Sequence, residues 1–275
     1  MGMTSNSDEL GDRMKAYEAV ETSHAFEGLL PIYARIDGRS FSKFTRGMDR
    51  PFDPRMTASM VATTKQLVQE THARIGYTQS DEINLVWICD APESEPLFGG
   101  KIQKLTSVLA SMAAAHFANA IGVHFGTNEA VRLSAMAPHF DARTFQLPSK
   151  VEAANTLLWR AMDARKNAVS MATRVLYSPK AMHGADQSAM RAMLAAKGVD
   201  FESYPPAFKW GTFVRRVNCE RAMTAEELER IPEKHRPRPD ALIMRSEVRE
   251  IEMPEFRKVA NRVEVVFDGA DPIIQ

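Results

Sequence analysis

Two short acidic clusters stand where apolar stretches of the chain end. They are Asp37-Gly38 and Ser80-Asp81-Glu82. Each neighbouring apolar stretch has the composition of a buried strand, so both clusters are predicted to lie at strand ends. Mg²⁺ takes hard oxygen ligands and usually keeps only one or two protein carboxylates, with phosphate oxygens and water completing its shell. Two aspartates at strand ends can therefore share two Mg²⁺ ions, an arrangement that serves phosphoryl and nucleotidyl transfer.

The residues after the first aspartate are suited to hold a triphosphate. Gly38 permits a tight turn, and its carbonyl oxygen is a further candidate ligand for the metal. The backbone N–H groups of Arg39, Ser40 and Phe41 follow directly, and successive N–H groups in a turn can cradle phosphate oxygens. An aspartate followed by glycine is also common in ordinary turns, and spacing alone leaves this alternative open.

Further side chains extend the predicted site. Ser80 brings a hydroxyl group next to Asp81, and Arg50 brings a positive charge for a charge-assisted contact with phosphate. We take Asp37 and Asp81 as the catalytic, metal-binding carboxylates and Glu82 as a secondary catalytic candidate. A Ser-Asp-Glu sequence is also common at a solvated hairpin tip, so the acidic pair does not by itself establish a metal site.

The composition is ordinary for a soluble globular protein. The chain has 275 residues, 44% of them hydrophobic and 25% charged, which allows one large domain or a core with an appendage. Its 35 basic residues balance 35 acidic ones, so a nucleic acid would have to be bound by a local patch. Cys89 and Cys219 lack the spacing of a CxxC pair or a zinc site, and no apolar run approaches the roughly 20 residues that span a bilayer. We therefore expect a cytoplasmic protein with no membrane partner.

Hydrophobic periodicity places the acidic clusters in an α+β fold. The expected strands are 30–36, 75–78, 83–88 and 140–147, and the expected helices between them are 53–72 and 101–119. The order strand, helix, hairpin, helix, strand favours an antiparallel sheet with helices packed on one face, as in ferredoxin-like and polymerase-palm domains.

The rest of the chain is expected to complete this domain and then to extend it. The later elements are helices over 152–177 and 186–197, a strand over 210–217, and further strands in the tail from residue 241. The predicted units are a palm-like catalytic core with the metal and nucleotide site over 1–150, a completing segment with RNA contacts over 151–217, and a C-terminal extension over 218–275.

Several separate motifs resemble, in the same order, those of the tRNA-His guanylyltransferase family. The likeness covers roughly residues 26–217, about two thirds of the chain. The matching segments are Arg35-Ile36-Asp37-Gly38-Arg39, Arg50-Pro51, Gln79-Ser80-Asp81-Glu82, Gly99-Gly100-Lys101-Ile102-Gln103-Lys104, Phe140-Asp141, Leu158-Trp159-Arg160 and Lys209-Trp210-Gly211-Thr212. Their common order is far more specific than any one of them.

The resemblance implies a palm-like fold and catalysis with two Mg²⁺ ions. It implies addition of nucleotides to the 5′ end of tRNA or tRNA-like RNA in the 3′-to-5′ direction, with GTP favoured and ATP as a second substrate. By position, Asp37, Gly38 and Asp81 hold the metal ions. The segment from Asp37 to Ser42 lines the nucleotide site together with Ser80 and Asp81. The resemblance also implies a homo-oligomer, often a tetramer.

Two positions depart from the family pattern. Arg50 stands where the family usually has a lysine, which keeps the charge but changes the geometry of the contact. Arg165 replaces a histidine, and only Asn167 remains of an asparagine pair. The sequence is closer to the guanylyltransferase-like branch of the family, which extends or repairs the 5′ ends of RNA more broadly.

Basic residues gather in the second half of the chain and are the expected contacts with RNA. Arg165, Lys166 and Lys197 are assigned to the phosphates or the RNA end, with aromatic residues such as Trp159 nearby in the sequence. The alternative interpretation is a set of solvated helix faces.

Two other functions stay open. The same pair of carboxylates in a palm fold serves nucleotide cyclases and dinucleotide synthases, which act on nucleoside triphosphates without RNA. The third alternative is a non-catalytic protein that binds RNA or a nucleotide, although such a protein has no need to keep both metal ligands. Product analysis with and without RNA separates the three.

Overall fold

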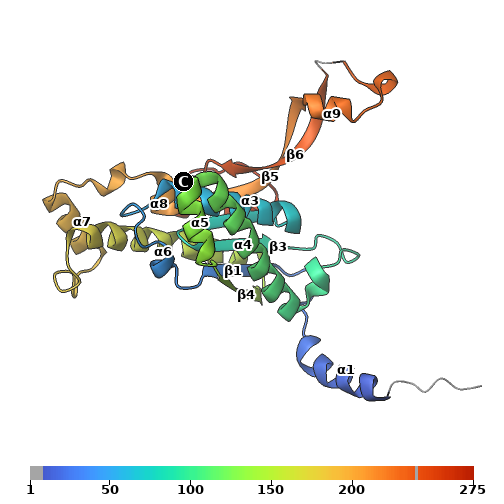
Figure 1. Cartoon of the computed structure of the whole chain (residues 1–275), viewed down its shortest axis with the longest axis horizontal. Coiled ribbons are helices and arrows are strands. Elements are labelled where there is room, and N and C mark those ends of the chain that lie inside the picture. Colours follow the sequence, from blue (N-terminus) through green and yellow to red (C-terminus); the bar gives the residue numbers. More distant parts are fainter. Residues whose placement is uncertain (1–8, 239–240) are drawn as a thin grey trace, which may run out of the picture.

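A six-stranded antiparallel sheet forms the centre of the protein (Figure 1). The computed structural model describes residues 9–238 and 241–275, so residues 1–8 of the first predicted unit and 239–240 of the last lie outside the described residues. The strand order is β4-β1-β3-β2-β5-β6. The strands are β1 Ile32–Gly38, β2 Ile75–Gln79, β3 Glu82–Trp87, β4 Phe140–Gln146, β5 Thr212–Ala222 and β6 Leu242–Ile251.

The first four strands and two helices form a βαββαβ unit of the ferredoxin-like type. Helix α3 (Pro54–Thr71) connects β1 to β2, and helix α4 (Ile102–His124) connects β3 to β4. Asp53 caps α3, since its side chain accepts a hydrogen bond of 2.9 Å from the backbone N–H of Arg55. The predicted α+β class with a palm-like antiparallel sheet is confirmed.

Helices cover both faces of the sheet, so the expectation of helices on one face is wrong. Ala34 and Ile36 of β1 belong to the core shared with α3 and α4, whereas Tyr33 belongs to a second core. Helix α6 (Lys150–Leu176) and helix α10 (Arg262–Phe267) pack in that second core. Every residue of β2 and β3 is buried, and a strand buried in this way needs a covering layer on each face.

The other elements surround this core. They are helices α1 Glu9–Thr22, α2 Phe41–Phe44, α5 Thr127–Ala135, α7 Gln187–Ala196, α8 Pro206–Trp210 and α9 Ala225–Glu229, and 3-10 turns at Leu97–Gly100, Phe201–Ser203, Glu233–His235 and Phe256–Lys258. The sequence analysis does not predict α1 or α5. Helix α1 projects from the body (Figure 1) and buries none of its residues, so it lacks the apolar periodicity on which the prediction depends.

Strands β5 and β6 form a long hairpin, the β5–β6 arm, that extends away from the body (Figure 1). Only residues 212–214 of β5 pair with β2, and from there the hairpin continues as two strands with α9 near its end. The tail was expected to add strands. It adds β6 and then returns to the body, where Phe256 and the residues of α10 pack against Phe213 in the second core.

Helix α4 is long and apolar enough, by length and composition alone, to cross a membrane, and it is the one described helix with this property. Leu105, Leu109, Ala113 and Phe117 of α4 are buried in the core that α4 shares with the sheet and α3. This face of α4 packs in the protein core, although only 28% of the apolar window of the helix is buried.

Candidate active site

The two predicted acidic clusters meet at one edge of the sheet. Register pairs Asp37 of β1 with Glu82 of β3, and the backbone N–H of Gly38 donates a hydrogen bond of 3.0 Å to the carbonyl oxygen of Asp81. Ser80 and Asp81 form the two-residue turn of the β2–β3 hairpin, with Ser80 at a φ of 53°. The structure thus brings together carboxylates from two strands at the sheet tip, as the sequence predicts.

Gly38 is required at this tip for steric reasons. A Cβ atom at this position would lie 2.4 Å from the ring of Phe41, which is buried at the start of α2. The ring of Phe41 packs against Phe44, Phe117 and Phe140, so it has no room to move away. The close approach of the backbone to this aromatic cluster fixes the turn that follows the first aspartate.

Both tip carboxylates lie in surroundings that disfavour their charge. Burial raises the pKa of Asp37 to about 6, and repulsion from Asp81, Glu82 and Asp141 adds to this rise. Burial also raises the pKa of Asp81, although the hydroxyl group of Ser80 partly opposes the rise. In the described part of the chain neither aspartate forms an ion pair. A cation bound between them would relieve both the desolvation and the repulsion.

The donor set fits Mg²⁺ bound together with a phosphate-bearing substrate. Residues 9–238 and 241–275 contain no group of three or more His, Cys, Asp or Glu side chains arranged to hold a metal alone. Mg²⁺ needs no such group, because one or two carboxylates with phosphate oxygens and water satisfy it. Asp37 and Asp81 supply the carboxylates, and Gly38, whose carbonyl is a further candidate ligand, is joined to Asp81 through its backbone N–H.

The third predicted carboxylate, Glu82, has a different environment. Arg160 of α6 donates two hydrogen bonds of 2.7 Å, one to each carboxylate oxygen of Glu82. The side-chain amide of Asn84 donates to the same carboxylate at 2.8 Å, and the hydroxyl group of Tyr33 donates to Asn84 at 2.8 Å. Glu82 is buried, and its charge is neutralised by Arg160. The geometry gives it the role of a residue that positions β3 against α6.

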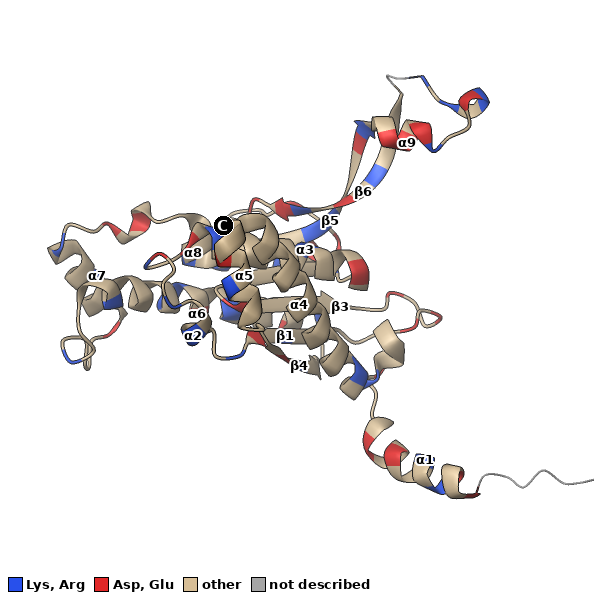
Figure 2. Ribbon diagram, in the orientation of Figure 1, with Lys and Arg blue, Asp and Glu red and all other residues tan. Residues whose placement is uncertain are grey.

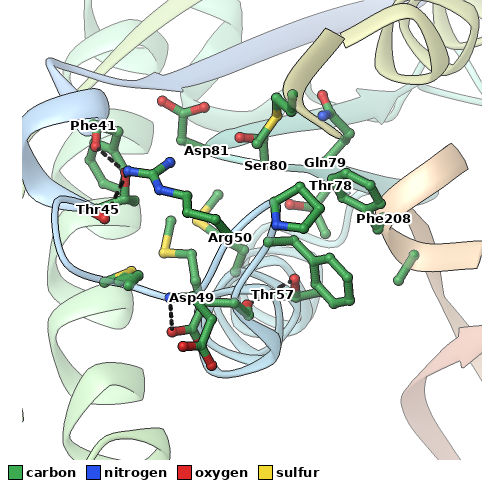
Figure 3. A pocket seen from close by; sticks show the side chains of 18 of the residues that line it. Phe41, Thr45, Asp49, Arg50, Thr57, Thr78, Gln79, Ser80, Asp81 and Phe208 are labelled. Carbon is green, nitrogen blue, oxygen red and sulfur yellow. Dashed lines mark hydrogen bonds between the residues drawn. The ribbon is translucent and has the colours of Figure 1, made fainter. Parts of the chain in front are cut away.

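An apolar pocket of about 290 Å³ opens on the α3 side of the tip (Figure 3). It contains five residues of the predicted nucleotide site, namely Phe41, Ser42, Arg50, Ser80 and Asp81. Sequence reasoning missed its other wall, which is made of methionines of α3 and the preceding loop together with Phe52 and Phe208. These two rings stack with centroids 4.8 Å apart. An aromatic wall in the pocket that Asp81 also lines suits a nucleobase with its phosphates at the tip.

A second, polar pocket of about 410 Å³ lies on the α6 side of the same tip. Asp37 and Asp81 line it together with the cationic side chains of Arg35, Arg160 and Arg174. Asn167 and Ser170 of α6 add neutral polar groups, and Gln79, Ser80, Asp81 and Met171 line both pockets. Alternation along β1 is the signal that could have assigned Arg35 to this site, because it lies on the same strand face as Asp37.

Comparison with known proteins agrees with this geometry. Residues 11–148, half of the chain, match the model of the tRNAHis guanylyltransferase family. The chain belongs to this family. The tRNA(His) guanylyltransferase of Neurospora crassa is 26% identical over 219 residues, which make up 73% of this chain and 72% of that protein. Membership of the family makes the protein a nucleotidyltransferase.

Two solved structures of bacterial tRNA(His) guanylyltransferase-like proteins share the fold, each with a TM-score of 0.67. The first, in complex with ATP, is 31% identical and covers 75% of this chain and 88% of its own. The second, in complex with GTP, is 26% identical and covers 94% of this chain and 97% of its own. Their coverage extends the likeness past residue 148, where the family model ends, to the elements that complete the second pocket.

Backbone hydrogen bonds within the protein already occupy part of the predicted phosphate cradle. The backbone N–H of Arg39 donates a hydrogen bond of 2.9 Å to the carbonyl oxygen of His139, beside the β1–β4 ladder. Ser40 adopts a left-handed conformation with a φ of 59° and begins α2. Its N–H and that of Phe41 have no backbone acceptor among the described residues. Arg50 donates a hydrogen bond of 3.3 Å to the carbonyl oxygen of Thr45 (Figure 3), on the wall of the apolar pocket.

The three residues predicted to bind RNA are placed differently from one another. The guanidinium of Arg165 lies between the rings of Trp210 and Phe201, 4.4 and 4.8 Å from their centroids, and forms an ion pair with Glu202. Its side chain is only 11% exposed, so it joins α6 to the segments around α8. Lys166 and Lys197 are exposed and remain accessible to a phosphate backbone.

Proposed function

We propose that the protein is a magnesium-dependent nucleotidyltransferase that adds nucleotides, GTP above all, to the 5′ end of tRNA or tRNA-like RNA in the 3′-to-5′ direction. The single observation that carries this proposal is a pair of carboxylates without an ion-pair partner in an arginine-lined pocket, one of which, Asp81, also lines the adjoining apolar pocket. One pocket suits the incoming nucleoside triphosphate, and the other suits a second phosphate-bearing group. Transfer between two such groups requires both to reach the same tip.

The tip would bind the metal ions, and the apolar pocket would bind the base. Asp37, Asp81 and the Gly38 carbonyl would hold two Mg²⁺ ions, which when bound neutralise the triphosphate charge and polarise the reacting phosphorus. Phe52 and Phe208 hold the base by stacking and exclude water from that side of the tip. These roles need no titrating side chain other than the tip carboxylates.

The polar pocket would bind the 5′ end of the RNA. Arg35 and Arg174 can each donate several N–H groups to the terminal phosphates, and Asn167 can orient them with its amide. Lys166 of α6 and Lys197, which follows α7, are exposed and would contact the RNA backbone. We further infer that the enzyme acts in the cytoplasm as a homo-oligomer.

A 5′-addition assay tests the proposal. The protein is incubated with a 5′-truncated tRNA, labelled GTP, ATP and Mg²⁺, and the labelled RNA is resolved on a gel. We expect incorporation by the wild type and loss of it with Asp81→Ala or with EDTA. Equal incorporation by wild type and Asp81→Ala would show that the metal assignment is wrong. A control reaction without RNA detects a cyclic or dinucleotide product, which would support a cyclase or synthase in place of 5′ addition.

A further inference from the structure

A cluster of charged side chains joins helix α6 to the segments that precede β5. Arg165 of α6 forms an ion pair with Glu202, and the ammonium group of Lys209 in α8 lies 3.4 Å from the same carboxylate. Lys209 also donates a hydrogen bond of 2.5 Å to the backbone carbonyl oxygen of Glu202. The side chains of Arg165 and Lys209 are each 11% exposed. One carboxylate therefore neutralises two cations that are almost buried.

Aromatic rings connect this cluster to the apolar pocket. The guanidinium of Arg165 lies against the rings of Phe201 and Trp210. Phe201 meets Tyr204 edge-on with ring centroids 5.9 Å apart, and Tyr204 meets Phe208 in the same way at 5.2 Å. Phe208 is one of the two stacked rings in the wall of the apolar pocket (Figure 3). An unbroken series of contacts therefore runs from Arg165 to the wall of this pocket. Figure 2 shows how the charged residues are distributed over the whole chain.

A contribution to stability does not by itself account for an almost buried Arg165. One nitrogen of its guanidinium, Nη1, is buried and has no hydrogen-bond partner among the described residues. Removing a charged group from water is costly, and apolar side chains of similar volume often stabilise a fold equally well. Hydrogen bonds to a guanidinium, however, have a fixed geometry that apolar contacts lack. The ion pair with Glu202 therefore fixes the relative position of the elements that it joins.

Helix α8 depends on such contacts for its position. It has five residues, and a helix of this length is not stable by itself. The hydroxyl group of Tyr77 donates a hydrogen bond of 2.8 Å to the carbonyl oxygen of Trp210 and so holds the last residue of α8 on the sheet. The contacts of Lys209 and Trp210 with Glu202 and Arg165 hold α8 toward α6. The position of the pocket wall on α8 therefore depends on this cluster.

We propose that the Arg165–Glu202–Lys209 cluster positions Phe208 against Phe52 and thereby sets the wall on which the base of the incoming nucleotide stacks. This inference rests on the proposed function, which places a nucleobase in the apolar pocket. Arg165 is then a positioning residue for the nucleotide and not a contact with RNA. Because α6 also lines the polar pocket, the cluster holds the base-binding wall at a fixed distance from the pocket for the RNA end.

Equilibrium dialysis with labelled GTP and Mg²⁺, in the absence of RNA, tests the proposal. Arg165→Met should raise the Kd for GTP at least several-fold, and Arg165→Lys should raise it less, because lysine keeps the charge but not the planar guanidinium. Glu202→Gln keeps the size of the side chain and should also raise the Kd, which provides a second variant if Arg165→Met does not fold. Circular dichroism checks the fold of each variant.

Arg191→Met is the matched control. The guanidinium of Arg191 also lies over the Phe201 ring, at 5.8 Å, but it is exposed and forms no ion pair within the described chain. Its removal should leave the Kd for GTP unchanged. Equal affinities of the wild type and Arg165→Met, or an equal loss with Arg191→Met, would overturn the inference. If the wild type itself did not bind GTP, the proposed function would be wrong, and the inference with it.

A double-mutant cycle tests whether Arg165 acts through Phe208. Phe208→Ala should raise the Kd for GTP about tenfold, the order expected when a base loses a stacking partner. In that background Arg165→Met should add little, because both changes affect the same ring. Fully additive losses would show that Arg165 acts on the nucleotide in another way and would contradict the positioning role.

The 5′-addition assay separates positioning of the nucleotide from contact with RNA. With Arg165→Met, the KM for GTP should rise while kcat and the KM for the RNA stay near their wild-type values, the pattern expected when binding is lost equally from the ground state and the transition state. A rise in the KM for the RNA with an unchanged KM for GTP would identify Arg165 as an RNA contact and overturn the inference.

Discussion

At the tip of the β2–β3 hairpin, Asp37 and Asp81 face open pockets and form no ion pair within the described chain. One position further along β3, Glu82 lies under α6 and is bound through both oxygens by Arg160. The fold raises the pKa of both aspartates but supplies Glu82 with a cation. A carboxylate can therefore have two roles in this protein. Glu82, which has a protein cation beside it, stabilises the fold. The two tip aspartates, which have none, are available to a metal ion.

The largest expected effect comes from removing a tip charge. Asp37→Asn should lower 5′ addition about a thousand-fold, because losing several kcal/mol of charge stabilisation corresponds to such a factor. Its free energy of unfolding without metal should stay the same or rise, since a half-buried charge and its repulsion are removed. Chemical denaturation and the gel assay measure the two quantities. If Asp37→Asn instead lowered the free energy of unfolding strongly, the Asp37 carboxylate would be stabilising the fold, as Glu82 does. The distinction between the tip carboxylates and the Glu82–Arg160 pair would then be wrong.

Breaking the buried Glu82–Arg160 pair should, in contrast, lower the free energy of unfolding. Arg160→Met leaves Glu82 buried without its cation, and loss of one partner of such a pair costs about 3–5 kcal/mol. Urea denaturation should show this loss directly. Adding Glu82→Gln to Arg160→Met removes the orphaned charge and should recover more than half of the stability. If the double variant is no more stable than Arg160→Met, charge burial is not the cause.

The smallest expected effect is a pH dependence of stability in metal-free protein. The pKa of Asp37 is about 6 in the fold, against an ordinary value of 3.8, so the folded state binds its proton more tightly than the unfolded state. The contribution of Asp37 to stability is therefore fully present below about pH 4 and falls as the pH rises through 6. Melting temperatures in EDTA from pH 4 to 7 should show this fall, and Asp37→Asn should flatten it. Saturating Mg²⁺ should stabilise the protein at pH 7, because the metal takes the place of the proton.

Structural features that depend on residues close together in the chain could be predicted from the sequence. Asp53-Pro54 predicts the start of α3, and the turn at Ser80-Asp81 follows from two flanking apolar stretches. Contacts between segments that are distant in the chain could not be predicted. Nothing near Arg165 in the sequence indicates that Phe201 and Trp210 enclose its guanidinium, and nothing near Phe52 indicates that Phe208 stacks on it.

By itself, the sequence determined that two aspartates end apolar strands, that the elements follow the order of a ferredoxin-like unit, and that the motifs are those of one family. These follow from residue type and spacing, which act over a few neighbours. Only the tertiary structure decided which of these carboxylates has an ion-pair partner and which has none. Arg160 is 78 positions from Glu82 in the chain, and only the packing of α6 on the second face of the sheet brings the two together. The charge state of a buried group depends on what surrounds it in space, and spacing along the chain does not contain that information.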